Sequence, residues 1–163
     1  MRDDACNGAQ VRAFFMKEMG RDGIEIPASA VLVVDDETAI CHCLVELLES
    51  EGYTTAVAHD GDEALAWLRE HGAPHAMILD LMMPRVSGWD VLATLTEEKR
   101  TPPPFPVIVV SAFPGSATRT VDGYGLAAVL GKPFDIDALF DVLATANQAG
   151  AAWRAAKPQA AAD

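Results

Sequence analysis

Cysteine is scarce in this chain of 163 residues, which contains only Cys6, Cys41 and Cys43. Three cysteines do not make a disulfide framework. Cys41 and Cys43 stand two positions apart on a predicted helix, so they point to different faces. We therefore expect them to be small core residues or bystanders rather than a redox or zinc pair, and we expect the protein to work in a reducing cytoplasm.

Long apolar runs and basic residues are also missing. No stretch approaches the ~20 apolar residues of a membrane helix, and the first ten residues, MRDDACNGAQ, lack the apolar core of a signal peptide. Twelve Lys and Arg residues stand against 24 Asp and Glu residues, which gives a net charge of −12. Because binding to nucleic acid relies on cations that meet phosphates, we expect no direct nucleic-acid partner and no membrane partner, but a protein partner.

Five short apolar runs, most of them followed by a helical pattern, organise residues 30–149. The first run, AVLVV, is continuous rather than alternating, which is typical of strands buried on both faces of a parallel sheet. The five strands are expected at residues 30–34, 53–58, 76–79, 107–110 and 127–130. This alternation predicts an α/β fold with helices on both faces of a five-stranded, doubly wound parallel sheet.

The flanking segments are less regular. Residues 1–29 form an N-terminal extension that is either a partly ordered leader or a short amphipathic helix. Its apolar residues recur at near-helical spacing, at Val11, Phe14, Phe15 and Met19. Residues 114–125 predict a weak fourth helix, because proline and glycine destabilise helices, so this segment is either mobile or a short rigid loop. Residues 150–163 predict a flexible, alanine-rich tail.

Residues of distinct chemistry end or follow four of the predicted strands. Asp35 and Asp36 follow the first strand and Asp80 the third, while Ser111 follows the fourth and Lys132 the fifth. Ligands of open parallel sheets bind outside the carboxyl ends of the strands, so we expect these side chains at one edge. Three carboxylates need a cation there, and Mg²⁺ prefers oxygen ligands. A hydroxyl and an ammonium suit the oxygens of a phosphoryl group, so the pattern predicts a metal and a phosphate.

Asp80 is the candidate nucleophile of this edge, because a carboxylate can attack phosphorus to form an aspartyl phosphate. Mg²⁺ or Mn²⁺ would neutralise one phosphoryl oxygen, while Lys132 would pair with a second and Ser111 would donate to a third. Each residue also has a structural explanation when it is taken singly: a helix start, a turn serine or a solvated lysine. Their combination favours the functional interpretation.

The motifs around these residues resemble the receiver domains of two-component response regulators, including the stand-alone, chemotaxis-type receivers. DLMMPRVSG, with proline four and glycine eight positions after Asp80, is similar to that family's phosphoacceptor loop, and VVDD, the serine with Ala112, and KPF are similar to its other motifs. The resemblance spans residues 30–148. It implies a flavodoxin-like strand order of 2-1-3-4-5. It also implies that Asp80 is phosphorylated by a histidine kinase or a histidine phosphotransfer protein.

The resemblance further implies a set of metal ligands, which are Asp35, Asp36, Asp80 and the backbone carbonyl of Met82. It implies a cis bond before Pro133, a bond type almost confined to proline. Val129 departs from the family, which usually carries an aromatic residue at this position whose rotamer reports phosphorylation. One interpretation is that Val129 is a plain strand residue without a switching role. The functional implication is that any change in output runs through Ser111 and the loop after it. In the family, the positions of Phe113 and Met82 flank the phosphoryl group and influence how water reaches it. Both side chains are bulky and apolar here, so we expect them to slow self-dephosphorylation.

The resulting hypothesis is a single-domain response regulator whose receiver domain covers residues 30–149. It accepts a phosphoryl group on Asp80 and signals by contact with an unknown downstream protein. It is not expected to be an enzyme, because it modifies only itself. Two alternatives stay open: a receiver-like scaffold that works without phosphorylation, and an aspartate-dependent phosphohydrolase, although Asp35 and Asp36 are adjacent rather than separated by one residue. A homodimer also stays open.

Overall fold

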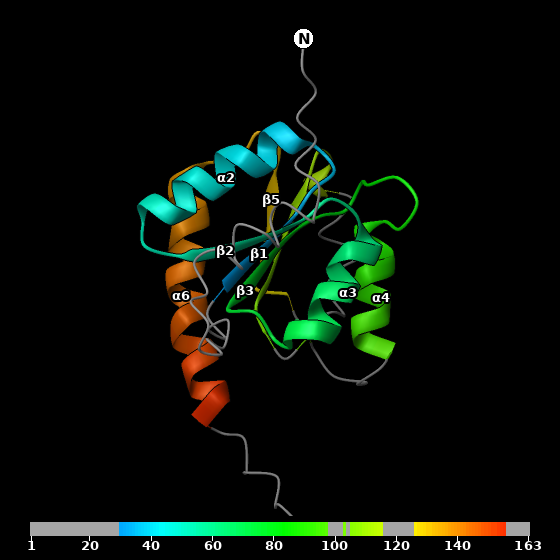
Figure 1. Ribbon diagram of the computed structural model, residues 1–163. Coiled ribbons are helices and arrows are strands. Elements are labelled where there is room, and N and C mark those ends of the chain that lie inside the picture. The colour runs from blue at the N-terminus through cyan, green and yellow to red at the C-terminus, as the bar shows by residue number, and fades with distance from the viewer. Residues whose placement is uncertain (1–29, 98–102, 104, 116–125, 156–163) are drawn as a thin grey trace, which may run out of the picture.

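The computed structural model describes residues 30–97, 103, 105–115 and 126–155, and its centre is a parallel sheet (Figure 1). The strands are β1 (Ala30–Val34), β2 (Thr54–Ala58), β3 (Ala76–Asp80), β4 (Val107–Ser111) and β5 (Ala128–Gly131). Their order across the sheet is β2-β1-β3-β4-β5, and every neighbouring pair is parallel. The predicted α/β fold and its strand order are therefore confirmed.

Helices cover both faces of this sheet. The described helices are α2 (Thr38–Ser50), α3 (Gly61–His71), α4 (Gly88–Glu97) and α6 (Ile136–Ala155). Figure 1 shows α2 and α6 on one side of the strands and α3 and α4 on the other. Among the residues that the structure describes, no helix combines the length and the apolar character that crossing a bilayer requires.

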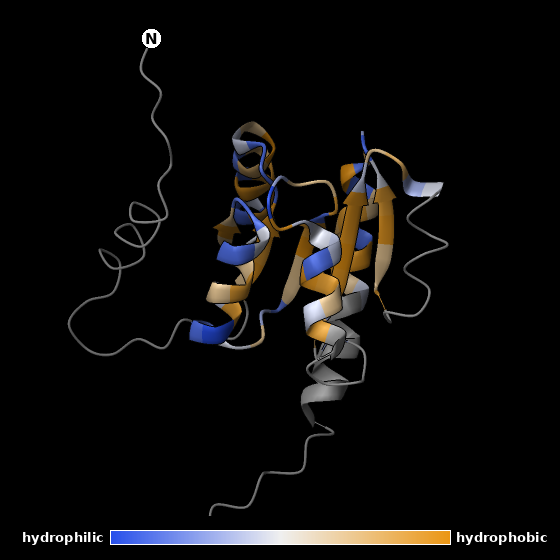
Figure 2. Ribbon diagram, turned by 90° about the vertical axis from the view of Figure 1, so that its right-hand side faces the viewer, coloured by the Kyte–Doolittle hydropathy of each residue, from blue (hydrophilic) through white to orange (hydrophobic). Residues whose placement is uncertain are grey.

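The continuous apolar run of β1 is explained by this sandwich of layers. Val31 and Val33 pack into the core beneath α2 and α6, whereas Leu32 and Val34 pack into the core beneath α3 and α4. Successive side chains of a strand point to opposite faces, and both faces of β1 are covered, so every position of this strand is apolar and buried. The hydropathy colours of Figure 2 likewise make the strands the most hydrophobic part of the molecule.

The last helix ends later than the sequence indicated. We predicted a flexible tail from residue 150, but α6 continues to Ala155. Alanine is the strongest helix former, so the alanine-rich stretch after residue 150 extends the helix. The predicted extension at residues 1–29, most of the weak fourth helix (residues 116–125) and residues 156–163 lie outside the described part of the chain.

Candidate functional site

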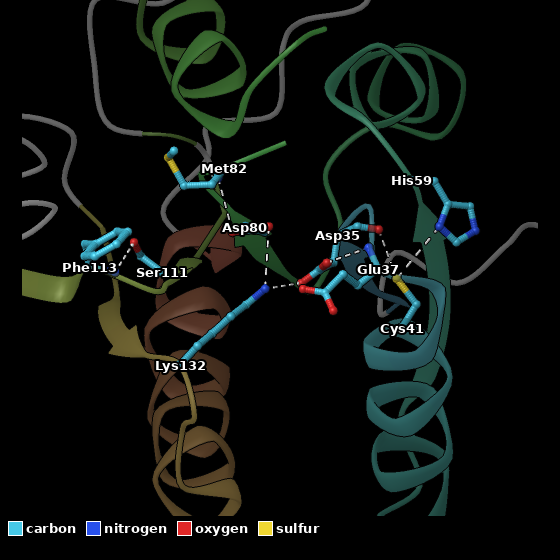
Figure 3. Close-up of polar contacts among 9 residues, drawn as sticks. All are labelled: Asp35, Glu37, Cys41, His59, Asp80, Met82, Ser111, Phe113 and Lys132. Atoms are coloured by element: carbon cyan, nitrogen blue, oxygen red, sulfur yellow. Dashed lines mark hydrogen bonds and ion pairs between the residues drawn. The ribbon is translucent and has the colours of Figure 1, made fainter. Parts of the chain in front are cut away.

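The register of the sheet brings the predicted site residues to one edge (Figure 3). Asp80, the last residue of β3, pairs with the residue before Ser111 on β4. Ser111 in turn pairs with Gly131, the residue before Lys132 on β5. Asp35 directly follows β1, the neighbour of β3 on its other side. Asp35, Asp80, Ser111 and Lys132 therefore lie at the same carboxyl edge, at the ends of four strands that are neighbours in the sheet, as the sequence predicted.

Three carboxylates form an acidic cluster at this edge. Ligand oxygens of Asp35, Asp36 and Asp80 all lie within 4.8 Å of one another, with Asp35 and Asp80 buried and Asp36 exposed. The Nζ atom of Lys132 lies 2.8 Å from Asp35 Oδ2 and 3.5 Å from Asp80 Oδ2. One ammonium against three carboxylates leaves two negative charges. A divalent cation with a preference for oxygen ligands matches this donor set and this charge.

Burial and charge shift the pKa values of two of these groups. The pKa of Asp80 is raised, mainly by burial and further by Asp35, although the Met82 N–H and Lys132 oppose the shift. Burial alone would lower the pKa of Lys132, but the hydrogen bond and charge of Asp35 together with the charge of Asp80 raise it instead. The lysine is therefore firmly cationic, while Asp80 gives up its proton less readily than a solvated aspartate.

The backbone beside Asp35 is fixed by two contacts within the β1–α2 turn. The Glu37 N–H donates to Asp35 Oδ1 at 2.8 Å, and the Cys41 thiol donates to the Asp35 carbonyl at 3.2 Å. Burial, followed by the charge of Asp35, raises the pKa of Cys41 to about 12, so the thiol keeps the proton that it donates. Cys41 is buried and Cys43 exposed, which confirms that they occupy different faces. The spacing of the cysteines in the sequence did not predict the hydrogen bond from the Cys41 thiol to the Asp35 carbonyl.

Asp80 is oriented by the loop that follows it. The Met82 N–H donates to Asp80 Oδ1 at 3.2 Å, and the Gly88 N–H donates to the Leu81 carbonyl at 3.2 Å. A Cβ atom at Gly88 would lie 2.2 Å from the Asp80 carbonyl oxygen. Only glycine therefore allows the start of α4 to approach the backbone of Asp80 so closely, which explains the glycine eight positions after the aspartate.

The β4 and β5 ends of the site are joined through the backbone. The Lys132 N–H donates to the Ser111 carbonyl at 2.8 Å, and Ser111 Oγ accepts the Phe113 N–H at 3.1 Å. The Lys132–Pro133 peptide bond is cis, as the resemblance implied. Val129 is partly buried and packs against the core on the α3 and α4 side.

An apolar rim, formed by Met82 and Phe113, borders the acidic cluster. Their exposed fractions are 61% and 68%, and they are the exposed large hydrophobic residues of the described part of the chain. Figure 3 shows both beside Asp80 and Ser111, on the side away from Asp35. Ala112, between Ser111 and Phe113, is also exposed.

Comparisons with known proteins agree with this geometry. A family model described as the response regulator receiver domain matches residues 31–144. The transcriptional regulatory protein CpxR of Klebsiella pneumoniae is 40% identical over 107 residues, which are 64% of this chain and 43% of that protein. The chain thus spans less than half the length of this curated relative.

Two similar solved structures are those of response regulators. The receiver domain of the Francisella response regulator 1452 is 32% identical with a TM-score of 0.64, and the match covers 74% of this chain and 98% of that one. The response regulator TrrA from Thermotoga maritima, solved in complex with Mg²⁺ and BeF, is 30% identical with a TM-score of 0.61, covering 72% of this chain and 97% of that one.

Proposed function

This chain belongs to the response regulator receiver domain family, and on that premise we propose that Asp80 accepts a phosphoryl group from a histidine kinase or a histidine phosphotransfer protein. The observation that carries the proposal is the Lys132 ammonium, which lies 3.5 Å from the buried Asp80 carboxylate within an acidic cluster. Receiver domains are phosphoacceptor signalling modules and are not generally classed as enzymes.

Receiver domains bind Mg²⁺ at an acidic pocket, and the cluster of this chain fits such an ion in charge and in donor type. Asp35, Asp36, Asp80 and the backbone carbonyl of Met82 would hold it. When bound, Mg²⁺ or Mn²⁺ supplies positive charge against the oxygens of the incoming phosphoryl group. The two negative charges that Lys132 leaves unbalanced support this assignment.

The transfer itself needs little from the protein beyond position and charge. A carboxylate oxygen of Asp80 attacks phosphorus while the P–N bond to the donor histidine breaks and its electron pair returns to the imidazole. Asp80 must be ionised for this attack, and its raised pKa opposes ionisation. The Lys132 ammonium and the Met82 N–H both stabilise the ionised form, and both stay in place to hold charge on the product.

Ser111 has the hydrogen-bonding capacity to contact the phosphorylated product. Its oxygen accepts the Phe113 N–H, and a hydroxyl that accepts one bond still has its own O–H to donate. The O–H group would donate to a phosphoryl oxygen, and any shift of Ser111 would reach Lys132 through their backbone hydrogen bond. Since Val129 carries no ring that could change rotamer, we assign the output to Ser111 and the loop of Ala112 and Phe113.

The apolar rim of Met82 and Phe113 would keep water from the phosphorylated Asp80, which supports slow self-dephosphorylation. The response would pass to a downstream protein by contact, in the cytoplasm. The net charge of −12 supports a protein partner rather than direct contact with nucleic acid.

Incubation with acetyl phosphate and Mg²⁺, followed by intact mass, tests the proposal. We expect a gain of one phosphoryl group that disappears in Asp80→Asn and when the metal is chelated. A set of small phosphate esters separates the phosphohydrolase alternative, which requires sustained multiple turnover. A wild-type protein that binds Mg²⁺ but gains no phosphoryl group would instead support a scaffold that works without phosphorylation.

A further inference from the structure

The loop that follows Asp80, residues 81–87, holds an unusual backbone conformation. Arg85 has a φ of 66°, and it is the one non-glycine residue with positive φ in the part of the chain that the structure describes. Side chains with a Cβ atom rarely adopt this region, which favours glycine or asparagine. An arginine at such a position is uncommon, which draws attention to the contacts of its side chain.

The side chain of Arg85 reaches the start of a different helix. Its Nη2 atom donates to Asp60 Oδ2, which lies 25 positions earlier in the chain. The Asp60 side chain is 7% exposed, whereas that of Arg85 is 75% exposed. A carboxylate that is largely withdrawn from water requires a charge partner or several hydrogen bonds, and Arg85 is the cation that meets it.

Asp60 is held in place independently of the arginine. Its Oδ1 atom accepts the Glu63 N–H at 2.8 Å and caps α3, while Glu63 Oε2 accepts the His59 N–H at 2.8 Å. The two side chains thus satisfy two backbone donors, the Glu63 N–H in the first turn of α3 and the His59 N–H just before Asp60. Asp60 therefore offers a fixed anchor, and the more exposed Arg85 is the movable member of the pair.

Backbone contacts place the loop flat against the same helix start. The Gly61 N–H donates to the Val86 carbonyl at 3.2 Å. A Cβ atom at Gly61 would lie 2.4 Å from Val86 Cγ1, so the loop has no room to shift toward α3. The ion pair thus attaches the loop of residues 81–87 to α3 at Arg85. The same loop begins with the residues around Met82, whose N–H donates to Asp80.

We propose that Asp60 and Arg85 are positioning residues of the phosphoacceptor site: their ion pair fastens the loop to α3. It thereby keeps the Met82 backbone in the conformation in which its N–H meets Asp80 and in which its carbonyl would serve as a metal ligand. This inference rests on the proposed function. Without the pair, the loop visits other conformations, and the apparent affinity for Mg²⁺ falls by the fraction of time spent in them. Neither residue contacts the reacting atoms.

Three single variants test the pair, and a fourth serves as the control. Arg85→Gly removes the cation but keeps positive φ accessible, and Asp60→Asn removes the charge but keeps an oxygen to cap α3. Arg85→Lys keeps a cation without the planar guanidinium. Arg69→Ala is the matched control, because Arg69 is an exposed arginine on α3.

The first readout is amide hydrogen exchange in metal-free protein. We expect Arg85→Gly and Asp60→Asn to speed the exchange of the Met82 and Gly61 amides by about threefold to tenfold, the range of an ion pair with one partner withdrawn from water. Exchange of the β1 and β4 amides stays as in the wild type, which shows that the fold is intact. Arg85→Lys restores part of the protection, and Arg69→Ala changes nothing.

The second readout is Mg²⁺ binding, followed by the rate of phosphorylation from acetyl phosphate. The dissociation constant for Mg²⁺ rises by the reciprocal of the fraction of protein whose loop stays closed. Saturating Mg²⁺ recovers the rate, so the defect lies in binding rather than in the maximal rate. The double variant is no worse than either single variant, because both remove the same interaction. Faster exchange with unchanged Mg²⁺ affinity, or unchanged exchange in both single variants, overturns the inference. A wild type that takes up no phosphoryl group overturns the proposed function instead.

Discussion

The ammonium of Lys132 lies 2.8 Å from a carboxylate oxygen of Asp35, although the two residues stand 97 positions apart in the chain. The two residues come close because each directly follows a strand of the same parallel sheet. Asp35 follows β1 and Lys132 follows β5, so both lie at the carboxyl edge of the sheet. In the metal-free protein this lysine is the cation that meets the acidic cluster. A divalent ion would have to share the Asp35 carboxylate with it, so we expect the lysine to oppose metal binding, even though in the proposed function it would support phosphorylation.

Replacement of Lys132 should separate these two effects. Lys132→Met removes one positive charge next to the metal ligands, and we expect it to tighten Mg²⁺ binding by about tenfold, since charges about 4 Å apart interact by a few kcal/mol near a protein surface and salt reduces this. Phosphorylation by acetyl phosphate should fall in the same variant. Titration calorimetry measures the affinity, and Lys132→Arg is the control that keeps the charge. Weaker Mg²⁺ binding in Lys132→Met would contradict the competition.

The raised pKa of Asp80 predicts a pH-dependent cost to the metal-free fold. The folded state favours the neutral carboxyl, so the associated stability is complete below the ordinary pKa of 3.8 and is lost as the pH rises through the raised value. At pH 7 the wild type carries this cost and Asp80→Asn does not. We expect the variant to melt a few degrees higher in metal-free buffer, with the gap closing as the pH falls toward 4. A gap that is absent at pH 7 or independent of pH would count against the account.

Gly88 should be indispensable to the geometry of Asp80. A Cβ atom at this position would lie 2.2 Å from the Asp80 carbonyl oxygen, a backbone atom that cannot swing away. We expect Gly88→Ala to lower the free energy of unfolding by about 2–3 kcal/mol, measured by urea denaturation. Gly115→Ala is the control, because an added Cβ there meets nothing within 4 Å. Equal stabilities of the two variants would show that the approach of α4 to Asp80 is not tight.

The apolar rim predicts a long phosphorylated lifetime. Replacement of both Met82 and Phe113 by serine should shorten the half-life of the phosphorylated protein severalfold, because water then reaches the acyl phosphate more easily. The decay is followed by intact mass after removal of acetyl phosphate. A double replacement by leucine keeps the rim apolar and should retain the wild-type lifetime. A lifetime that survives the serine replacements would remove this role of the rim.

The fold and the edge residues were readable from the sequence because both follow from short-range patterns. Continuous apolar runs such as AVLVV identify buried parallel strands, and the residue after each run then lies at the carboxyl edge whatever the details of packing. The contact of the Cys41 thiol with the Asp35 carbonyl was not readable, because it depends on how the β1–α2 turn closes.

The pairing of Arg85 with Asp60 escaped for a related reason. Arg85 stood within the DLMMPRVSG motif, but nothing local in the sequence joins it to Asp60, which lies 25 positions earlier. Their meeting depends on α3 and the Asp80 loop packing side by side. The length of α6 depended on the balance between helix propensity and fraying in an alanine-rich stretch, and the sequence interpretation favoured fraying.

The central claim is that Asp80 carries the phosphoryl group. Reduction of the phosphorylated protein with borohydride converts an acyl phosphate into an alcohol, which marks the modified residue, and peptide mass spectrometry then locates it. The account predicts homoserine at position 80, in a Mg²⁺-dependent manner and without label at Asp35 or Asp36. Label at either of those residues, or none in a protein that binds Mg²⁺, would contradict it.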